Sequence, residues 1–589
     1  MNKWNLDLLF KSEEEFLKAL EEVKGMISES ASYKGKLNDP KKLREYLIKE
    51  KDLVLKINKV YAFAALRSDL NKKIVENNAD VTKVQYCFAM LQEALSFEGP
   101  EILKCGKEYI DEFFKNNDDL SEFKFGFEQL FRGAKYVLDD KSEKLLSQYA
   151  ALENEGSNIY SMLAVGDGKP RKITLSNGEE RFITHGNWRN EIIEAPTAED
   201  REKVFKAVFG VYEENKNTFG QIYDTVVQAE LAEAKARGYD SILQSHLYGD
   251  NIPLSVYETL VKVASTNTAA VKKYNELRRK YLGLEKYHTY DRFLELSKSS
   301  KKYTFEQAKD LFFKSIEKFD DDFVNKAHEV LKEGYVDVYE TEGKRTGAYS
   351  NGGQGIHPYI LLNFDGNLDD VFTVAHESGH SIHTLYTMEN QPLMLQDYTI
   401  FVAEIASTFN EHNLLDYLME SGELNKEDKI LLLQKAIDEI MATFYRQTLF
   451  AQFELDISRK AEQGEPINYQ VCNEEMIKLY KLYYDIDITE EEVKSYVWAY
   501  IPHIFYTPFY VYQYATSFSA SLKLYDNVKK YGQPAFERYK GLLKAGGSKY
   551  PTEEAKDAGV DFEDPETFLA VTNRMAELVD ELEVLLNEK

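Results

Sequence analysis

Residues 371–385, VFTVAHESGHSIHTL, combine the pattern of a buried helix with three histidines and one glutamate. Histidine is scarce in this chain, with only 10 among 589 residues, so their concentration here calls for a chemical reason. Asp369 and Asp370 precede the stretch, and acidic side chains stabilise the positive N-terminal end of a helix. The apolar residues that follow carry the chain inward. The pattern predicts a buried helix over residues 368–390.

The pentapeptide HESGH places His376 and His380 four residues apart, on one helix face and about one turn apart. Two imidazoles at that spacing can hold one metal ion. Glu377 projects about 100° round the helix from His376, beside such an ion. This is the H-E-x-x-H arrangement of two zinc ligands and one general base. A hydrogen-bonded histidine pair in the core is the alternative, but buried imidazoles need partners and one metal ion satisfies both.

A catalytic zinc ion needs a third protein ligand and an open position for water. His383 shares the face of His376 but lies about 10 Å along the axis, so we expect it to pack or support the site. Residues 399–415 form a second apolar helical segment that contains Glu404 and Glu411 on one face. Since buried carboxylates are rarely unpaired, we predict that Glu404 is the third ligand and that Glu411 orients a ligating histidine.

Two histidines and one glutamate around zinc lower the pKa of a bound water to about 7. Glu377 could then take a proton from the attacking water and pass it to a leaving amine. Amide hydrolysis uses all of these parts, so the segment predicts a zinc metallopeptidase with one zinc ion per chain.

A later segment, residues 499–521, offers donors for the oxyanion that such a reaction produces. It reads AYIPHIFYTPFYVYQYATSFSAS and contains His503, Tyr506, Tyr510 and Tyr514. Two prolines, Pro502 and Pro508, predict a constrained loop that enters a helix. Spacing alone does not select the hydroxyl that faces the metal.

Helical patterns dominate the rest of the chain, interrupted by two β-rich intervals. Residues 169–185 alternate around Asn177-Gly178, which predicts a hairpin and, with it, a transition between an N-terminal helical domain (1–190) and a catalytic domain (191–589). Residues 335–364 predict a small sheet: YVDVYE as a strand, TGAYS returning beside it, NGGQG as a loop and PYILLNF as a further strand. The predicted fold class is mainly α with a small sheet.

Composition narrows the range of partners. The formal net charge is −27, which disfavours nucleic acid and anionic membranes. No apolar run reaches a membrane span, and the first residues meet acidic side chains too early for a signal peptide. The three scattered cysteines, Cys87, Cys105 and Cys472, suggest a reducing compartment. We therefore expect a cytoplasmic protein, either a monomer or a simple homo-oligomer.

Further motifs extend over nearly the whole chain. They are WNLDLLF, GAYSNGG, PYILLNFDGNLDDVFTVAHESGHSIH, FVAEIASTFNEH, HIFYTPFYVYQYATS, LLKAGGSKYP and AGVDFEDPETF. Together they closely resemble oligoendopeptidase F of the thimet-oligopeptidase family of zinc peptidases. The resemblance implies that His376, His380 and Glu404 bind zinc and that Glu377 is the base. It also implies that His503 and Tyr510 face the oxyanion.

The resemblance carries further expectations about architecture. It implies a largely helical zincin-type metallopeptidase with a deep enclosed channel that admits short unstructured peptides. It also implies that Gly347, Ala348 and Tyr349, together with PYILLNF, lie near the cleft, where a strand edge could pair with extended substrate.

Two other functions remain open from the sequence. H-E-x-x-H does not fix where the cut falls, so a helical zinc exopeptidase is one alternative, although no arginine-rich clamp for a peptide terminus stands near the zinc segments. A non-catalytic zinc or peptide scaffold is the other, and the presence of Glu377 argues against it because a binder would not need a base.

Overall fold

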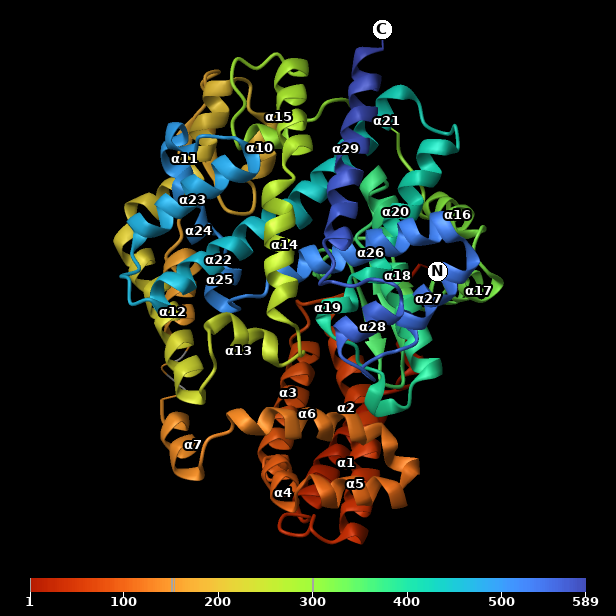
Figure 1. The fold of residues 1–589 in the computed structure, drawn as a ribbon. Coiled ribbons are helices and arrows are strands. Elements are labelled where there is room, and N and C mark those ends of the chain that lie inside the picture. Colours follow the sequence, from red (N-terminus) through yellow and green to blue (C-terminus); the bar gives the residue numbers. More distant parts are fainter. Residues whose placement is uncertain (1, 150–151, 153, 299–300, 589) are drawn as a thin grey trace. The chain divides into compact units, whose positions relative to one another are not determined.

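The computed structural model describes residues 2–149, 152, 154–298 and 301–588. The chain divides into two compact units, and each unit is assembled from three separate stretches. The first unit consists of Met1–Lys135, Ser300–Glu420 and Leu524–Val560; the second consists of Tyr136–Ser299, Ser421–Lys523 and Asp561–Lys589. Helices make up most of both units, which confirms the predicted fold class (Figure 1). The boundary predicted at residue 190 is a division along the sequence and stays a prediction.

The first unit begins with helices whose ends follow from local chemistry. Ser12 caps α1 (Glu13–Ala31) by accepting a hydrogen bond from the backbone N–H of Glu15, and Pro40 opens α2 (Pro40–Leu70) at a first-turn position. The other helices of this unit are α3 (Val75–Leu95), α4 (Glu98–Cys105), α5 (Lys107–Asn116), α6 (Lys124–Gly133), α16 (Phe305–Ile316), α17 (Asp321–Val330), α18 (Leu368–Asn390), α19 (Ile400–Ala403), α20 (Ile405–Glu420), α27 (Gln533–Leu543) and α28 (Pro551–Asp557).

A three-stranded sheet lies in the first unit, in the order β3 (Val336–Asp337), β5 (Ile356–Leu361), β4 (Tyr349–Gly353). The sequence predicted a strand over YVDVYE with TGAYS returning beside it. Instead β3 is only two residues long and runs parallel to β5, and β4 pairs antiparallel with β5. The predicted NGGQG loop is also wrong in part, because its first three residues belong to β4 and the turn is confined to Gln354 and Gly355.

Helix α18 is the central element of the first unit for function. It contacts α16, α17, α20 and the strands β4 and β5. Ser381 on α18 and Ser350 on β4 share a hydrogen bond of 2.8 Å between their hydroxyls. The apolar residues at its start, from Val371 to Ala375, are almost fully buried except Thr373. The helix covers residues 368–390, as predicted, and reaches the interior flanked by a sheet and a helix.

In its described residues, the second unit has helices and one hairpin, β1 (Arg171–Thr174) and β2 (Glu180–Ile183), which confirms the prediction around Asn177-Gly178. Gly178 has φ +85°, a conformation that favours glycine in this turn. Its helices are α7 (Asp140–Ser147), α9 (Glu155–Ser161), α10 (Trp188–Glu194), α11 (Ala198–Glu214), α12 (Lys216–Arg237), α13 (Ile242–Tyr248), α14 (Leu254–Thr266), α15 (Ala269–Tyr281), α21 (Lys426–Ile440), α22 (Arg446–Glu462), α23 (Tyr469–Tyr484), α24 (Val497–Tyr500), α25 (His503–Tyr506) and α29 (Pro565–Asn587). Helix α26 (Tyr512–Tyr531) begins in this unit and ends in the first.

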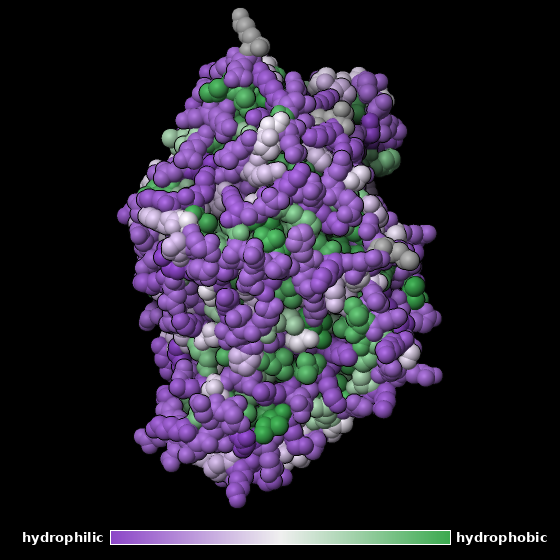
Figure 2. All heavy atoms as spheres, turned by 90° about the vertical axis from the view of Figure 1, so that its right-hand side faces the viewer, coloured by the Kyte–Doolittle hydropathy of each residue, from purple (hydrophilic) through white to green (hydrophobic). Residues whose placement is uncertain are grey.

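Hydrophilic residues predominate on the face drawn in Figure 2, and hydrophobic residues show between them in small groups. This agrees with a chain in which charged residues make up 29% of the sequence. Among the described residues, none of the helices combines the length and the apolar character that a bilayer crossing requires.

Candidate metal centre

The start of α18 is fixed by a reciprocal cap. The Asn367 side chain accepts a hydrogen bond from the backbone N–H of Asp370 (2.9 Å), and the Asp370 carboxylate accepts one from the N–H of Asn367 (3.0 Å). From that point the helix carries His376 and His380 to the same side, one turn apart.

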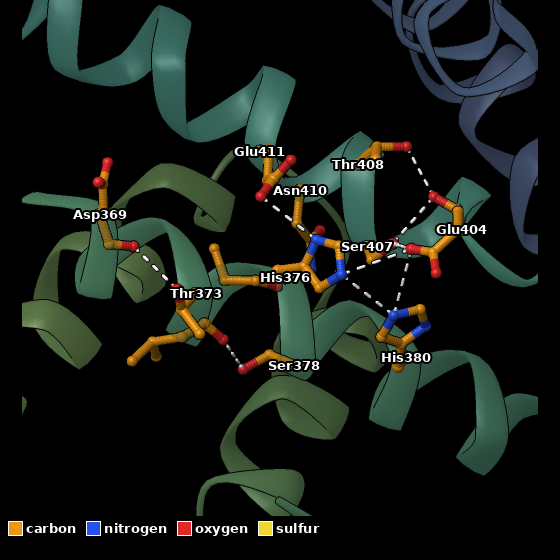
Figure 3. Close-up of polar contacts among 12 residues, drawn as sticks. Asp369, Thr373, His376, Ser378, His380, Glu404, Ser407, Thr408, Asn410 and Glu411 are labelled. Carbon is orange, nitrogen blue, oxygen red and sulfur yellow. Dashed lines mark hydrogen bonds and ion pairs between the residues drawn. The ribbon is translucent and has the colours of Figure 1, made fainter. Parts of the chain in front are cut away.

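Three ligand atoms converge at this place (Figure 3). The Nε2 atoms of His376 and His380 lie 3.2 Å apart, and each lies 3.4 Å from Oε2 of Glu404. Glu404 stands at the break between α19 and α20, with φ −84° and ψ −2°, which turns its side chain back toward α18. These three residues form a group with the composition and spacing of a metal site.

The spacing suits a zinc ion. Four ligands placed tetrahedrally at zinc bonds of about 2.0–2.1 Å are separated from one another by about 3.3–3.4 Å, close to the three separations found here. The protonation of His376 also fits. Because Oε1 of Glu411 lies 3.2 Å from Nδ1 of His376, one proton stays on that nitrogen, and Nε2 would present its lone pair to a bound metal ion. The residues present therefore fit a bound zinc ion.

Other side chains hold Glu404 in place. Ser407, one helical turn on, donates to the Glu404 carboxylate and to its backbone oxygen, both at 2.9 Å. The Thr408 hydroxyl donates to the same backbone oxygen at 2.6 Å. Asn410 bridges the two helices by donating to the backbone oxygen of Ala375 at 3.1 Å. Together these contacts restrict both the rotamer of Glu404 and the position of α20 against α18.

Gly379 allows α18 and α20 to approach each other closely. A Cβ atom at this position would lie 2.5 Å from the backbone oxygen of Ala406 and 2.6 Å from the Cα of Ser407. Both distances are shorter than any real Cβ contact, and the atoms it would meet are backbone, which cannot rotate away. The glycine in HESGH therefore sets the distance between the histidine helix and the segment that carries Glu404.

Glu377 lies beside the cluster and is 5% exposed. Burial raises the pKa of its carboxyl, and the neighbouring imidazoles of His376 and His380 partly oppose that rise. Its Oε2 atom has no hydrogen-bond partner among the residues that the structure describes. A buried carboxylate with an unused oxygen and a raised pKa is suited to accept and return a proton.

The ionisation of the cluster favours a cation at its centre. Burial would lower the pKa of His376, but the carboxylates of Glu411, Glu377 and Glu404 outweigh it and raise the pKa to about 10. Burial would raise the pKa of Glu404, but His380 and then His376 lower it to about 2. Without a metal ion, the positive charge between these carboxylates is the proton on His376, and a bound metal ion can replace that proton.

His383 is fully buried and lies outside the cluster. Its ring stacks on Tyr398 at 3.8 Å between centroids, and burial lowers its pKa to about 3. Neither ring nitrogen has a hydrogen-bond partner in the described part of the chain. The side chain is therefore a neutral packing group in this structure.

The segment Gly347, Ala348 and Tyr349 leads into β4, the edge strand that contacts α18. The Tyr349 hydroxyl donates to Asp69 at 2.8 Å, so it is engaged within the first unit. Residues of β4 line a cavity of about 280 Å³ together with Thr384 of α18. Strand β5, which contains most of PYILLNF, pairs on both sides, so the edge available in this part of the sheet belongs to β4.

The late segment belongs to the second unit. Pro502 precedes α25, and after Pro508 the chain adopts φ +58° at Phe509 before α26 begins, so the predicted constrained loop is confirmed. The His503 ring lies parallel to that of Tyr510, with centroids 6.2 Å apart, and Tyr514 meets both rings edge-on.

Tyr506 lies apart from that group. It is 44% exposed and contacts Tyr160 edge-on at 5.5 Å between ring centroids. His503 and Tyr506 both line a cavity of about 740 Å³ within the second unit. Burial lowers the pKa of His503, which keeps its imidazole neutral near pH 7.

Sequence reasoning missed two residues that shape the metal centre, Gly379 and Ser407, and a third, Tyr398, that packs on His383 outside the cluster. The first two have a recognisable signal. Gly379 is a glycine inside a helical pattern, which often marks close packing, and Ser407 follows Glu404 by three positions. Tyr398 stacks on His383 from a segment between helices, and no spacing in the sequence indicates that contact.

Comparison with known proteins agrees with this geometry. The family model described as "Peptidase family M3" matches residues 192–574, and that described as "Oligopeptidase F" matches residues 101–169. Oligopeptidase PepF of Bacillus subtilis is 34% identical over 585 residues, covering 99% of this chain and 87% of the relative. Group B oligopeptidase PepB of Streptococcus agalactiae is 30% identical, covering 99% and 97%.

Solved structures also resemble this chain over nearly its whole length. A Chlamydophila abortus protein superposes with a TM-score of 0.90 at 30% identity, covering 99% of this chain and 98% of the other. Oligoendopeptidase-F of Enterococcus faecium superposes with a TM-score of 0.75 at 27% identity, covering 98% and 99%. The chain therefore belongs to peptidase family M3 and, as a member of it, is a peptidase.

Proposed function

We propose that this peptidase is a zinc-dependent oligoendopeptidase, which hydrolyses internal bonds of short unstructured peptides. The observation that carries the proposal is the convergence of His376, His380 and Glu404 at 3.2–3.4 Å, next to the buried carboxylate of Glu377. Relatives described as oligoendopeptidase F or oligopeptidase support the size class of the substrate.

In the proposed mechanism, His376, His380 and Glu404 hold one zinc ion, and Glu411 keeps the proton of His376 on Nδ1. Bound zinc would polarise the scissile carbonyl and lower the pKa of a water molecule. Glu377 accepts a proton from that water as it attacks and then delivers the proton to the leaving amine. The raised pKa of Glu377 suits the second transfer, because a more basic carboxylate holds the proton until the amine departs.

Two residues of the second unit complete the proposal. His503 and Tyr510 carry N–H and O–H donors of the kind that stabilise an oxyanion, and the family resemblance assigns them that task. The proposal includes a cytoplasmic location and a stoichiometry of one zinc ion per chain.

The test combines one substitution with one substrate design. Glu377→Gln keeps the shape and removes the base, so the variant should bind one zinc ion and lose about 10²–10⁴-fold in turnover. The substrate is an internally quenched peptide blocked at both ends, which an endopeptidase cleaves and an exopeptidase does not. Undiminished turnover by the variant would remove Glu377 from the mechanism, and an intact blocked peptide would favour an exopeptidase.

A further inference from the structure

A cavity of about 370 Å³ in the second unit has an unusual set of charges. Its wall comes from α10, α15, α21, α22 and α23, from the short helix Asp291–Phe293 and from the helical segment Ile488–Tyr496 (Figure 1). Four cationic side chains line it: Arg189, Arg292, Arg446 and Lys494. Among the described side chains, the lining contains a single carboxylate, that of Asp438.

That carboxylate is already engaged. Tyr274 donates a hydrogen bond to Asp438 at 2.8 Å, Gln434 donates another at 3.2 Å, and the guanidinium of Arg278 lies 4.0 Å away. Glu491 is near Lys494 in sequence, but its carboxylate accepts a hydrogen bond from the backbone N–H of Thr289 at 2.8 Å. Neither acid forms an ion pair with the four cations of the cavity among the described residues.

Aromatic rings hold the cations instead. The ammonium of Lys494, a residue only 6% exposed, lies 4.9 Å from the centre of the Phe209 ring and 5.3 Å from that of Tyr480. Arg292 lies 4.5 Å over Phe293. Such contacts stabilise a cation less than its removal from water destabilises it. Aromatic contacts alone leave a net cost.

Mutual repulsion adds to that cost. Burial lowers the pKa of Arg292 to about 10, and the nearby charges of Arg446 and Arg189 contribute to the fall. Burial likewise lowers the pKa of Lys494 well below its usual range, helped by Arg446 and Arg292. The cavity therefore contains cations that destabilise one another.

Two other buried cations in the described part of the chain have carboxylate partners. Lys344 contacts Asp337 at 2.6 Å, and Arg201 contacts Asp291 at 2.9 Å. The chain has 100 acidic residues against 73 basic ones, so acidic partners are plentiful. The cavity differs, because the buried Lys494 and the half-buried Arg292 and Arg446 line it without a carboxylate partner among the described residues.

We propose that this cavity binds a small anion that carries two or three negative charges. The guanidinium group of arginine binds both phosphate and carboxylate oxygens. Four cations and one carboxylate leave a net positive charge of three, which an anion with two or three negative charges would neutralise. The volume lies in the range of small-molecule sites. Tyr274, Tyr287, Tyr480 and Tyr484 would contact an organic part of the ligand. Arg189, Arg446 and Gln447 also line the cavity of His503, so a bound anion would order a wall that both cavities share.

The experiment measures binding to the zinc-loaded full chain by calorimetry and by thermal unfolding. The probes are pyrophosphate, ADP and citrate, each against sodium chloride of equal ionic strength. At least one probe should bind at one site per chain and raise the unfolding midpoint, and the strongest of them separates a phosphate source from a polycarboxylate source. Shifts that chloride reproduces would mean simple screening and would overturn the proposal.

Lys494→Met keeps the length of the side chain and removes its charge. This variant should bind the anion at least about tenfold more weakly, as expected for a charge-assisted contact. Without anion it should unfold at a higher temperature than the wild type, because repulsion is relieved. Lys262→Met removes a charge from the exposed surface of the same unit and should do neither. Undiminished binding by Lys494→Met would contradict the proposal.

Two further variants serve as controls for folding and for anion binding at the metal centre. Arg189→Gln changes an exposed residue at the edge of the cavity, so it should fold normally and still weaken binding. His380→Ala disables the metal centre and should leave anion binding intact. Binding that survives Lys494→Met and disappears in His380→Ala would place the anion on the metal and refute the second site, whatever the outcome for the peptidase mechanism.

Discussion

Gly379→Ala is the most demanding test of how the metal centre is built. The substitution adds one methyl group to the helix face that meets α20 and changes no ligand. Alanine is a better helix former than glycine by about 1 kcal/mol, so α18 itself should gain stability. Any loss must therefore come from the contact between the two helices.

The size of that loss follows from the distances. The added Cβ would lie 2.5 Å from the oxygen of Ala406, while ordinary contacts are about 3.5 Å, so α20 must retreat by about 1 Å. Glu404 precedes Ala406 by two residues and would move with it, whereas metal bonds tolerate only about 0.2 Å. We expect overpacking to cost about 1–3 kcal/mol of unfolding free energy, and displacement of about 1 Å to cost about 10²-fold in turnover.

Zinc content by mass spectrometry, zinc affinity by competition with a chelating dye, and turnover of a quenched peptide measure these effects. Gly25→Ala is the matched control, because Gly25 lies in α1 of the same unit and a Cβ there meets nothing within 4 Å. It should stabilise the protein by up to about 1 kcal/mol and leave activity unchanged. If Gly379→Ala binds zinc and turns over as the wild type does, the close helix contact does not position Glu404.

Three other predictions concern the metal and the buried acids. Glu411→Ala should weaken zinc binding by about 10–100-fold and regain activity with added zinc, and an unchanged affinity would show that the contact with His376 is incidental. Chelation should abolish activity without loss of helical circular dichroism, because a chain with this much core does not need one ion to fold; a parallel loss of helicity would contradict this. Burial raises the pKa of Glu454 to about 8, so the folded chain keeps its proton while the unfolded chain loses it near 4.5. The free energy of unfolding should therefore fall as the pH rises between these values, by up to about 1.4 kcal/mol per pH unit. Glu454→Gln can still accept the hydrogen bond from the N–H of Phe509, and it should flatten the dependence of the unfolding midpoint on pH. An equally steep dependence in this variant would assign the effect to other groups.

Local patterns in the sequence determined the helices and part of the site. The cap before α18, the four-residue spacing of His376 and His380, and the apolar periodicity around Glu404 are properties of consecutive residues, and helix geometry converts them directly into positions. The Asn177-Gly178 hairpin is similar, because its strands are adjacent in the chain.

The tertiary structure decided what depends on contacts between distant segments. Periodicity shows that YVDVYE alternates, yet the partner of β3 is β5 and not its neighbour in sequence, because strand pairing depends on contacts between segments that are distant in the chain. The separation of α18 and α20 depends on one missing methyl group at Gly379, and the stacking of Tyr398 on His383 crosses a loop. The cluster of Arg189, Arg292, Arg446 and Lys494 comes from segments up to 305 residues apart, so no local pattern could indicate that these four charges share one cavity.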